Sequence, residues 1–174
     1  MVTCSVEPVR ARSAAHVELL VTASADPSVT EATYLPHGMT SAEAGQWASD
    51  HEHRAWVVCC DGVPVGVCSV SSCRDTCGVA VSPLGQETES WLLPAFRHRR
   101  LVSQAWQQIY PVVTARDVPQ LVAVIWESNV SSIRRVERDG YRHVGRGWWS
   151  DGICGGWCVV LVLDLPTRRD AIVT

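Results

Sequence analysis

The sequence contains no lysine: all fifteen basic residues among its 174 are arginine. This absence excludes a catalytic lysine and any chemistry that forms a Schiff base on one. The chain also lacks internal repeats, low-complexity segments and any apolar run near the roughly 18 residues that suggest a membrane span. Its first residues, MVTCSVEPVRARS, lack the apolar centre of a secretory signal. We therefore expect a soluble, cytoplasmic protein with no membrane partner.

The length and the 47% hydrophobic content are enough to bury one sizeable core. We expect a single domain over residues 1–174, with residues 166–174 as a flexible tail. A chain of this size has no need of disulfides, so the eight cysteines are expected to be free thiols. Cys73/Cys77 and Cys154/Cys158 have zinc-like spacing, but neither pair is the usual two-residue knuckle or has a suitably spaced histidine. We expect no metal.

Charge is distributed unevenly along the chain. Residues 1–96 hold 4 Arg against 11 acidic residues, whereas residues 97–174 hold 11 Arg against 7. This asymmetry could place an anionic ligand against the second half, or it could reflect solvated faces that happen to differ. The net charge of −3 argues against a dedicated nucleic-acid-binding protein.

The first half of the chain predicts one strand, two helices and a hairpin. Alternation of apolar and polar residues indicates a strand over Val6–Arg12, and Ser13 can cap a helix that reaches about Ser24. The segment SAEAGQWASDHEH predicts a second helix, capped by Thr40 or Ser41. Asp61-Gly62 separates two β-rich runs and is well suited to a two-residue hairpin turn; the runs are Arg54–Cys60 and Val63–Ser72.

The second half alternates strands and helices. The patterns predict strands over ETESWLLP, which Pro94 ends, over Leu121–Trp126, and over a final pair near Tyr141–Trp149 and Trp157–Leu165. Apolar residues at helical spacing predict helices over Leu101 to about Thr114 and over Ser131–Asp139, the latter stopped by Gly140. The fold class is therefore mixed α/β.

This order of elements resembles the GNAT superfamily of N-acetyltransferases over nearly the whole chain. The most specific segments are SWLLPAFRHRRLVSQAW, which resembles the family's fourth strand and acyl-CoA loop, and NVSSIRRVERDGYRHVG, which resembles its Asn-led helix. The SAEAGQW helix resembles the branch that acetylates protein α-amino groups. The resemblance implies one GNAT-like domain with a mostly antiparallel twisted sheet of about seven strands, about four helices, and splayed fourth and fifth strands.

The resemblance also implies a site for acetyl-CoA or another acyl-CoA. In the family, the loop that binds the pyrophosphate has Gln or Arg at its first position and small residues at two later positions. In this chain Arg97 matches the first position, whereas Arg100 and Val102 occupy the two positions of the small residues. A left-handed backbone conformation at Arg100 would cost roughly 1–2 kcal/mol. A charge-assisted hydrogen bond from arginine to a phosphate contributes roughly 1.5–3 kcal/mol, so arginine side chains could offset the loss of glycine. The implied donor-binding residues are Leu92, Leu93, Arg97, Arg99, Arg100, Leu101, Val102, Ser103, Asn129 and Ser132. Asn129 and Ser132 are also ordinary helix-capping residues.

Acid and base candidates follow from the same resemblance and from the strand pattern. Many family members place a tyrosine acid where this chain has Val136, which leaves Ser132, Tyr141 or water. Glu89 is our candidate base because Glu87, Glu89 and Trp91 share one face of their strand, with Trp91 shaping the acceptor pocket. Alternatively, these glutamates lie on a wet edge. Glu127 is the runner-up for the base, and Glu127 and His37 could both contact the acceptor.

The sequence therefore predicts a GNAT-type acyltransferase that transfers acetyl from acetyl-CoA to a primary amine of a small molecule or peptide N-terminus. An alternative is amide formation with an acyl or aminoacyl group delivered on a carrier protein or tRNA, with phosphates contacted by Arg97, Arg99, Arg100, Arg134, Arg135 and Arg138. A non-catalytic binding module with this fold is a third reading. Trp148, Trp149 and Trp157 could form an aromatic acceptor surface. A monomer or a homodimer is expected.

Overall fold

The computed structural model describes residues 3–73, 75–150 and 155–166. In chain order the elements are β1 (Cys4–Pro8), α1 (Ala14–Ser24), α2 (Pro27–Thr30), α3 (Ser41–His51), β2 (Ala55–Cys60), β3 (Val63–Ser72), β4 (Gln86–Leu92), η1 (Pro94–Phe96), α4 (Leu101–Thr114), β5 (Gln120–Trp126), α5 (Val130–Arg138), β6 (Arg142–Ser150) and β7 (Gly155–Asp164). Within these ranges no helix is long and apolar enough to cross a membrane.

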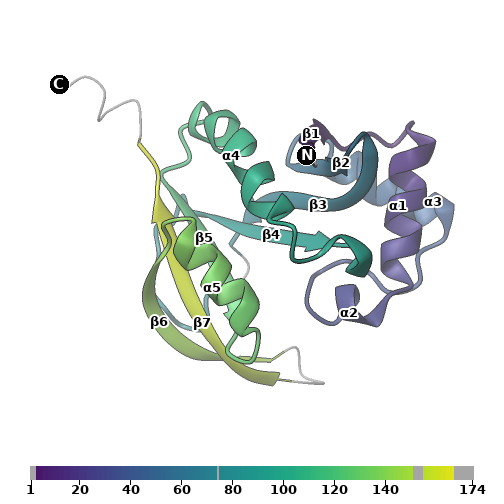
Figure 1. Ribbon diagram of the computed structural model, residues 1–174. Coiled ribbons are helices and arrows are strands. Elements are labelled where there is room, and N and C mark those ends of the chain that lie inside the picture. Colours follow the sequence, from purple (N-terminus) through teal and green to yellow (C-terminus); the bar gives the residue numbers. More distant parts are fainter. Residues whose placement is uncertain (1–2, 74, 151–154, 167–174) are drawn as a thin grey trace. The chain divides into compact units, whose positions relative to one another are not determined.

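The seven strands form one mixed sheet in the order β1-β2-β3-β4-β5-β7-β6 (Figure 1). The β1–β2, β2–β3, β5–β7 and β6–β7 pairs are antiparallel, and the β4–β5 pair is parallel. Among the described residues, the β4–β5 register covers Gln86 with Leu121 and Glu87 with Val122. The predicted fold class is confirmed, and this short ladder agrees with the expected separation of the fourth and fifth strands.

The chain divides into two compact units. The first comprises residues 1–70 and 89–109, and the second comprises residues 71–88 and 110–174. Strand β4 and helix α4 each contribute residues to both units, with the divisions after Thr88 and Ile109. Each unit is described separately below.

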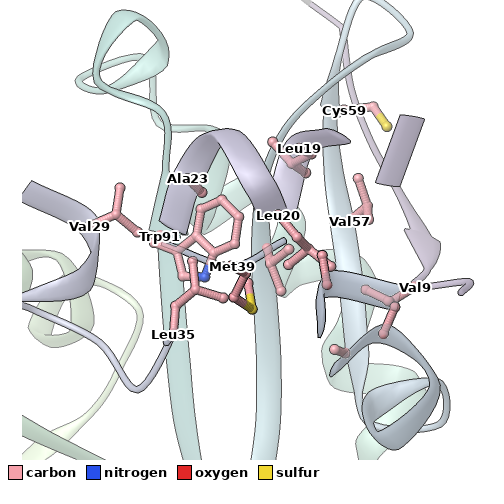
Figure 2. Packing of buried hydrophobic residues seen from close by; sticks show 14 residues of the cluster. Val9, Leu19, Leu20, Ala23, Val29, Leu35, Met39, Val57, Cys59 and Trp91 are labelled. Atoms are coloured by element: carbon pink, nitrogen blue, oxygen red, sulfur yellow. The ribbon is translucent and has the colours of Figure 1, made fainter. Parts of the chain in front are cut away.

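In the first unit, the hairpin of β2 and β3 packs against helices α1 and α3. Asp61 and Gly62 have φ of 51° and 80°, the left-handed pair that a two-residue hairpin turn requires, so the predicted turn is confirmed. A cluster of buried residues fills the space between the helices and the sheet (Figure 2). Its labelled members in the figure are Val9, Leu19, Leu20, Ala23, Val29, Leu35, Met39, Val57, Cys59 and Trp91.

Helix α3 begins with a complete capping box. The Thr40 hydroxyl accepts from the Glu43 backbone N–H at 3.3 Å, and the Glu43 carboxylate accepts from the Thr40 backbone N–H at 2.8 Å. Ser13 stands at the predicted cap position of α1, but its side chain makes no capping bond there. Helix α2 was not predicted. It lasts one turn, and Asp26 caps it by accepting from the Ser28 N–H.

The first strand lies two to four residues before its predicted position. We expected Val6–Arg12, whereas β1 ends at Pro8, which is paired with Trp56 at the end of the β2 register. Beyond it the chain turns, because the Ser13 N–H donates to the Arg10 carbonyl at 3.1 Å. The alternation in the sequence continues through this turn, so pairing with β2, and not the pattern, decides where β1 ends.

The second unit is built on β5, β7 and β6, with α5 packed along β5 (Figure 1). The connection between β3 and β4 covers part of this sheet: Cys73, Val79 and Val81 pack against the buried residues Val122, Val160 and Val162. Two glycines of β6 allow this connection to pack closely on the sheet. A Cβ on Gly145 would lie 2.7 Å from the Val79 side chain, and a Cβ on Gly147 would lie 2.5 Å from the Cβ of Cys77.

Candidate active site

Strand β4 carries three predicted site residues at alternate positions. Glu87, Glu89 and Trp91 leave the same face of the strand, with Glu87 in the second unit and the other two in the first. Trp91 is only 6% exposed, and it packs with Leu35 and Met39 in the core of the first unit (Figure 2). Trp91 is thus a core residue. It could influence an acceptor pocket only indirectly, through the way it packs against its neighbours.

Glu89 is held by the segment between α2 and α3. The backbone N–H of Tyr34 donates to Glu89 Oε1 at 2.8 Å, across 55 residues of sequence. A backbone donor orients a carboxylate without neutralising its charge. The sequence analysis missed Tyr34, because no local pattern signals a contact over this separation. His37, three residues further along the same segment, is exposed.

The end of β4 runs unusually close to β3. A Cβ built on Gly66 would overlap the carbonyl oxygen of Trp91 and lie 2.5 Å from Cδ2 of Leu92. The Leu93 N–H donates to the Val65 carbonyl at 2.9 Å. Only glycine at position 66 permits this approach, which fixes the backbone that the resemblance assigns to pantetheine. A glycine inside the β-rich run VPVGVCSV is a signal of close backbone approach that the sequence analysis did not use.

The turn between β4 and α4 contains two left-handed residues that are not glycine. Arg97 is extended, but His98 and Arg100 have φ of 63° and 61°. Arg100 therefore adopts the conformation that glycine takes without strain, at roughly 1–2 kcal/mol. The Arg100 carbonyl accepts from the Gln104 N–H at 3.1 Å, so the turn leads directly into α4 at Leu101.

The first turn of α4 presents amide groups without intrahelical partners, because helix geometry leaves the first N–H groups unpaired. In the part of the chain that the structure describes, no side chain caps the amides of Val102 or Ser103. Leu101 is buried, whereas Val102 and Ser103 are half-buried. Such a helix start carries partial positive charge and suits an anion.

Arg97 is turned toward its own chain. Its Nε donates to the Leu92 carbonyl at 3.1 Å, and its Nη2 donates to the Ser28 Oγ at 2.9 Å and to the Ser28 carbonyl at 3.3 Å. The contact with Ser28 spans 69 residues of sequence and was not predicted. The Arg97 side chain therefore joins the end of β4 to helix α2.

Arg99 and Arg100 are exposed at the start of α4. Arg99 Nη2 donates to the Ala95 carbonyl at 3.0 Å, and its guanidinium lies 5.3 Å from the centre of the Phe96 ring. These contacts hold Arg99 beside the turn without neutralising its charge. The two guanidinium groups thus add positive charge to the uncapped helix start.

In the second unit, Asn129 caps helix α5. Its Oδ1 accepts from the Ser132 N–H at 3.2 Å and from the Ser131 hydroxyl at 3.1 Å. The capping role foreseen for Asn129 is therefore present. Ser132 contributes its backbone N–H to this cap, and its side chain is half-buried.

Glu87 is buried, with 5% of its surface exposed, so it does not lie on a wet edge. It sits near two thiols of the β3–β4 connection. Burial, with the charge of Glu87 a smaller cause, raises the pKa of the Cys73 thiol. Burial raises the pKa of Cys77 as well, with Asp75 and Glu87 as further causes that act in the same direction.

Glu127 forms an exposed ion pair. Its Oε2 lies 2.7 Å from Nη2 of Arg146, and both side chains are about half exposed. The Arg146 guanidinium lies 4.3 Å from the centre of the Trp157 ring. Trp157 meets Trp148 edge to face at 5.8 Å, and the two rings are 46% and 56% exposed. An exposed aromatic pair therefore lies beside Glu127.

Trp149 packs differently from its neighbours. It meets Trp126 edge to face at 5.2 Å and is half-buried.

Tyr141 is enclosed in the second unit. Burial raises its pKa to about 12. Its residue surface is 5% exposed. Tyr141 is thus enclosed, whereas Ser132, another candidate for the acid, is half-buried.

Within the described ranges, no three His, Cys, Asp or Glu side chains are placed to hold a metal ion. Cys77 and Cys158 are free cysteines, and burial raises the pKa of Cys158 to about 12. Cys154 lies outside the described residues.

Comparisons with known proteins agree with the architecture. A family model described as acetyltransferase (GNAT) domain matches residues 8–142. A comparison with curated protein sequences finds no match. Three solved structures illustrate the likeness: a phosphinothricin acetyltransferase from Sinorhizobium meliloti in complex with AcCoA, a ribosomal-protein-alanine N-acetyltransferase from Brucella melitensis, and an N-acetyltransferase from Staphylococcus aureus.

These structures share the fold at low sequence identity. The Sinorhizobium enzyme has a TM-score of 0.75 at 18% identity, covering 96% of this chain and 91% of its own. The Brucella enzyme has a TM-score of 0.74 at 15% identity, covering 92% of this chain and 99% of its own. The Staphylococcus enzyme has a TM-score of 0.73 at 19% identity, covering 94% of this chain and 99% of its own. Because the family model spans most of the chain, the protein belongs to the GNAT family of acetyltransferases and is an acyltransferase.

Proposed function

We propose that this protein transfers an acetyl group from acetyl-CoA to a primary amine of a small molecule or peptide N-terminus. One observation carries the donor assignment: an uncapped helix start at α4, flanked by the exposed Arg99 and Arg100, directly follows β4. The similar Sinorhizobium structure contains AcCoA, and the Brucella relative is described as a ribosomal-protein-alanine N-acetyltransferase. These relatives support the donor and the amine class, respectively.

On the donor side, the proposed phosphate site consists of the side chains of Arg99 and Arg100 and the first amides of α4, those of Leu101, Val102 and Ser103. Arg97, which the resemblance also assigns to this loop, directs its guanidinium to Leu92 and Ser28 instead. Each charged hydrogen bond from Arg99 or Arg100 to a phosphate would contribute roughly 1.5–3 kcal/mol. This gain offsets the roughly 1–2 kcal/mol of left-handed strain at Arg100. Backbone groups of Leu92 and Leu93 would pair with the pantetheine amides.

Asn129 and Ser132 are the proposed pantetheine contacts from the second unit. Because two donors already engage Asn129 Oδ1, a ligand contact from this residue would use its Nδ2 group. Ser132 would use its hydroxyl, since its backbone N–H belongs to the cap.

In the proposed reaction the neutral amine attacks the thioester carbonyl, a C–N bond forms and the C–S bond breaks. The nitrogen loses one proton and the leaving sulfur gains one. Glu89, oriented by the Tyr34 amide, takes the proton from nitrogen. With Val136 at the family's tyrosine position and Tyr141 enclosed, Ser132 or water supplies the other proton.

On the acceptor side, the candidates for contact with the amine are exposed residues. His37 and Glu127 are exposed and could meet an acceptor, and the Trp148–Trp157 pair lies beside Glu127. Glu87 and Trp91 are buried, so their proposed influence is through the position of β4.

A carrier- or tRNA-borne donor is the second candidate, favoured by the exposure of Arg99 and Arg100. Affinity for charged tRNA that falls steeply with salt would favour this candidate, because phosphate contacts release counterions. Of the second-unit arginines named for this role, Arg134 and Arg138 are exposed, whereas Arg135 pairs with Asp139 at 2.9 Å.

The proposal is tested by intact-mass analysis of an amine panel, including peptides with free α-amino groups, incubated with protein and acetyl-CoA. We expect one acetyl group on at least one amine, and turnover about a hundredfold lower in Glu89→Gln. Glu137→Gln is the matched control and should retain turnover within about twofold, because the exposed Glu137 carboxylate is paired with His143 and has no proposed role in the site. No acetylated amine, together with no binding of acetyl-CoA, would contradict the proposal.

A further inference from the structure

Arg97 forms a polar bridge between two distant parts of the first unit. One end of its guanidinium is bonded to the Leu92 carbonyl at the end of β4, and the other to the Ser28 carbonyl and hydroxyl in α2. Two guanidinium nitrogens, directed at two different residues, exploit the planar fork of arginine, which lysine lacks. Arg97 is half-buried: its bond to the Leu92 carbonyl is part-buried, whereas its bonds to Ser28 are exposed.

The α2 end of this bridge is itself ordered. Asp26 Oδ1 accepts from the Ser28 N–H at 2.8 Å. The Ser28 side chain lowers the pKa of Asp26 most, and the Ser28 backbone bond and the charge of Arg97 are smaller causes in the same direction. Val29, the next residue, is fully buried in the core of the first unit. Helix α2 is therefore fixed by an apolar contact and by the Arg97 bridge.

The same segment contacts β4 a second time. Six residues after Ser28, the Tyr34 N–H donates to Glu89. Leu35, which follows, is buried in the same core cluster as Trp91. Residues 28–34 are thus attached to the end of β4 at both ends, once through Arg97 and once through Glu89.

We propose that Arg97 is a positioning residue: its bridge to Ser28 holds residues 28–34 in place, and thereby keeps the Tyr34 amide on the Glu89 carboxylate. The importance of Glu89 in this inference rests on the function proposed above. Arg97 then differs from Arg99 and Arg100, which face the helix start. Its side chain acts on the orientation of the base and not on the affinity for the donor.

Hydrogen exchange of the ligand-free protein tests the bridge directly. In Arg97→Gln we expect the amides of residues 28–35, including that of Tyr34, to exchange about tenfold faster, because a charge-assisted bond restrains them. Arg97→Lys should give an intermediate effect, and Ser28→Ala a smaller acceleration of the same amides. Arg100→Gln is the matched control and should leave their exchange unchanged.

Acetyl-CoA titration and kinetics on the amine found active separate positioning from donor binding. Arg97→Gln should lower kcat about tenfold with the KM for acetyl-CoA within about twofold, whereas Arg100→Gln should raise that KM about tenfold. The proposal is overturned if Arg97→Gln weakens acetyl-CoA binding as much as Arg100→Gln and leaves exchange of residues 28–35 unchanged.

Two further outcomes are decisive. If Arg97→Gln does not fold, Ser28→Ala answers the same question, and unchanged exchange in that variant counts against the bridge. If the wild-type protein fails to bind acetyl-CoA, the proposed function fails, while the exchange measurements still decide whether Arg97 restrains residues 28–34.

Discussion

Helices α4 and α5 begin in opposite ways. At α5, Asn129 accepts hydrogen bonds from the Ser132 N–H and the Ser131 hydroxyl, so the chain satisfies its own helix start. At α4, the preceding turn supplies two left-handed residues and exposed guanidinium groups, and among the described residues no side chain caps Val102 or Ser103. A capped helix start contributes to stability, whereas an uncapped helix start suits an anion, so we propose the start of α4 and not that of α5 as the phosphate site.

The largest effect is expected at the strand that leads into the uncapped helix. Gly66→Ala should lower the free energy of unfolding by about 3 kcal/mol, because its Cβ would collide with the Trp91 carbonyl. Urea unfolding measures the loss. Gly45→Ala is the matched control: nothing lies within 4 Å of its Cβ in helix α3, so it should stabilise by about 0.5–1 kcal/mol. Equal stability of the two variants would contradict the close approach of β3 and β4.

The next largest effect is expected when arginines are replaced at the start of α4 and, for comparison, in α5. The double variant Arg99→Gln/Arg100→Gln should weaken acetyl-CoA binding about tenfold to a hundredfold, because it removes charged hydrogen bonds to phosphate. Arg134→Gln/Arg138→Gln changes two exposed arginines of α5 and should alter the affinity less than about threefold. Calorimetric titration compares them. An equal loss in both double variants would mean that the arginines act through net charge and not at one helix start.

A smaller effect tests the capped helix. Asn129→Ala should destabilise the protein by about 1 kcal/mol, because α5 loses its side-chain cap. Asn129→Asp keeps an oxygen acceptor and should retain most of the stability in the same thermal unfolding experiment. If Asn129→Asp binds acetyl-CoA more weakly than wild type at unchanged stability, the Nδ2 group takes part in donor binding.

The smallest effect concerns strain in the turn. His98→Gly should raise the free energy of unfolding by about 0.5 kcal/mol, because relief of the left-handed conformation exceeds the entropy cost of glycine. His37→Gly changes another exposed loop histidine, outside the residues with positive φ, and should destabilise slightly. A loss of stability in both variants would show that the turn stores no strain at His98.

Local chemistry made much of this architecture predictable. The Asp61-Gly62 hairpin, the Thr40 cap and the extent of α4 follow from residues within a few positions of each other. The first strand was misplaced because its end depends on pairing with β2, which lies about fifty residues away.

The candidate site was less predictable, because its defining contacts join distant segments. The residues of β4 and its turn could be named from their pattern, but the bonds from Tyr34 to Glu89 and from Arg97 to Ser28 could not. Alternation places Trp91 and Glu87 on one face of the strand, yet alternation alone does not reveal that both are buried.

The central claim is that the end of the turn and the start of α4, residues 99–103, bind the phosphates of an acyl-CoA donor. The most direct measurement is calorimetric titration of the wild-type protein with acetyl-CoA and with S-acetylpantetheine, which carries the same thioester but no pyrophosphate or nucleotide. The account predicts that acetyl-CoA binds at least about a hundredfold more tightly, because several charged hydrogen bonds are lost with the phosphates. Equal affinities, or no binding of acetyl-CoA, would contradict it.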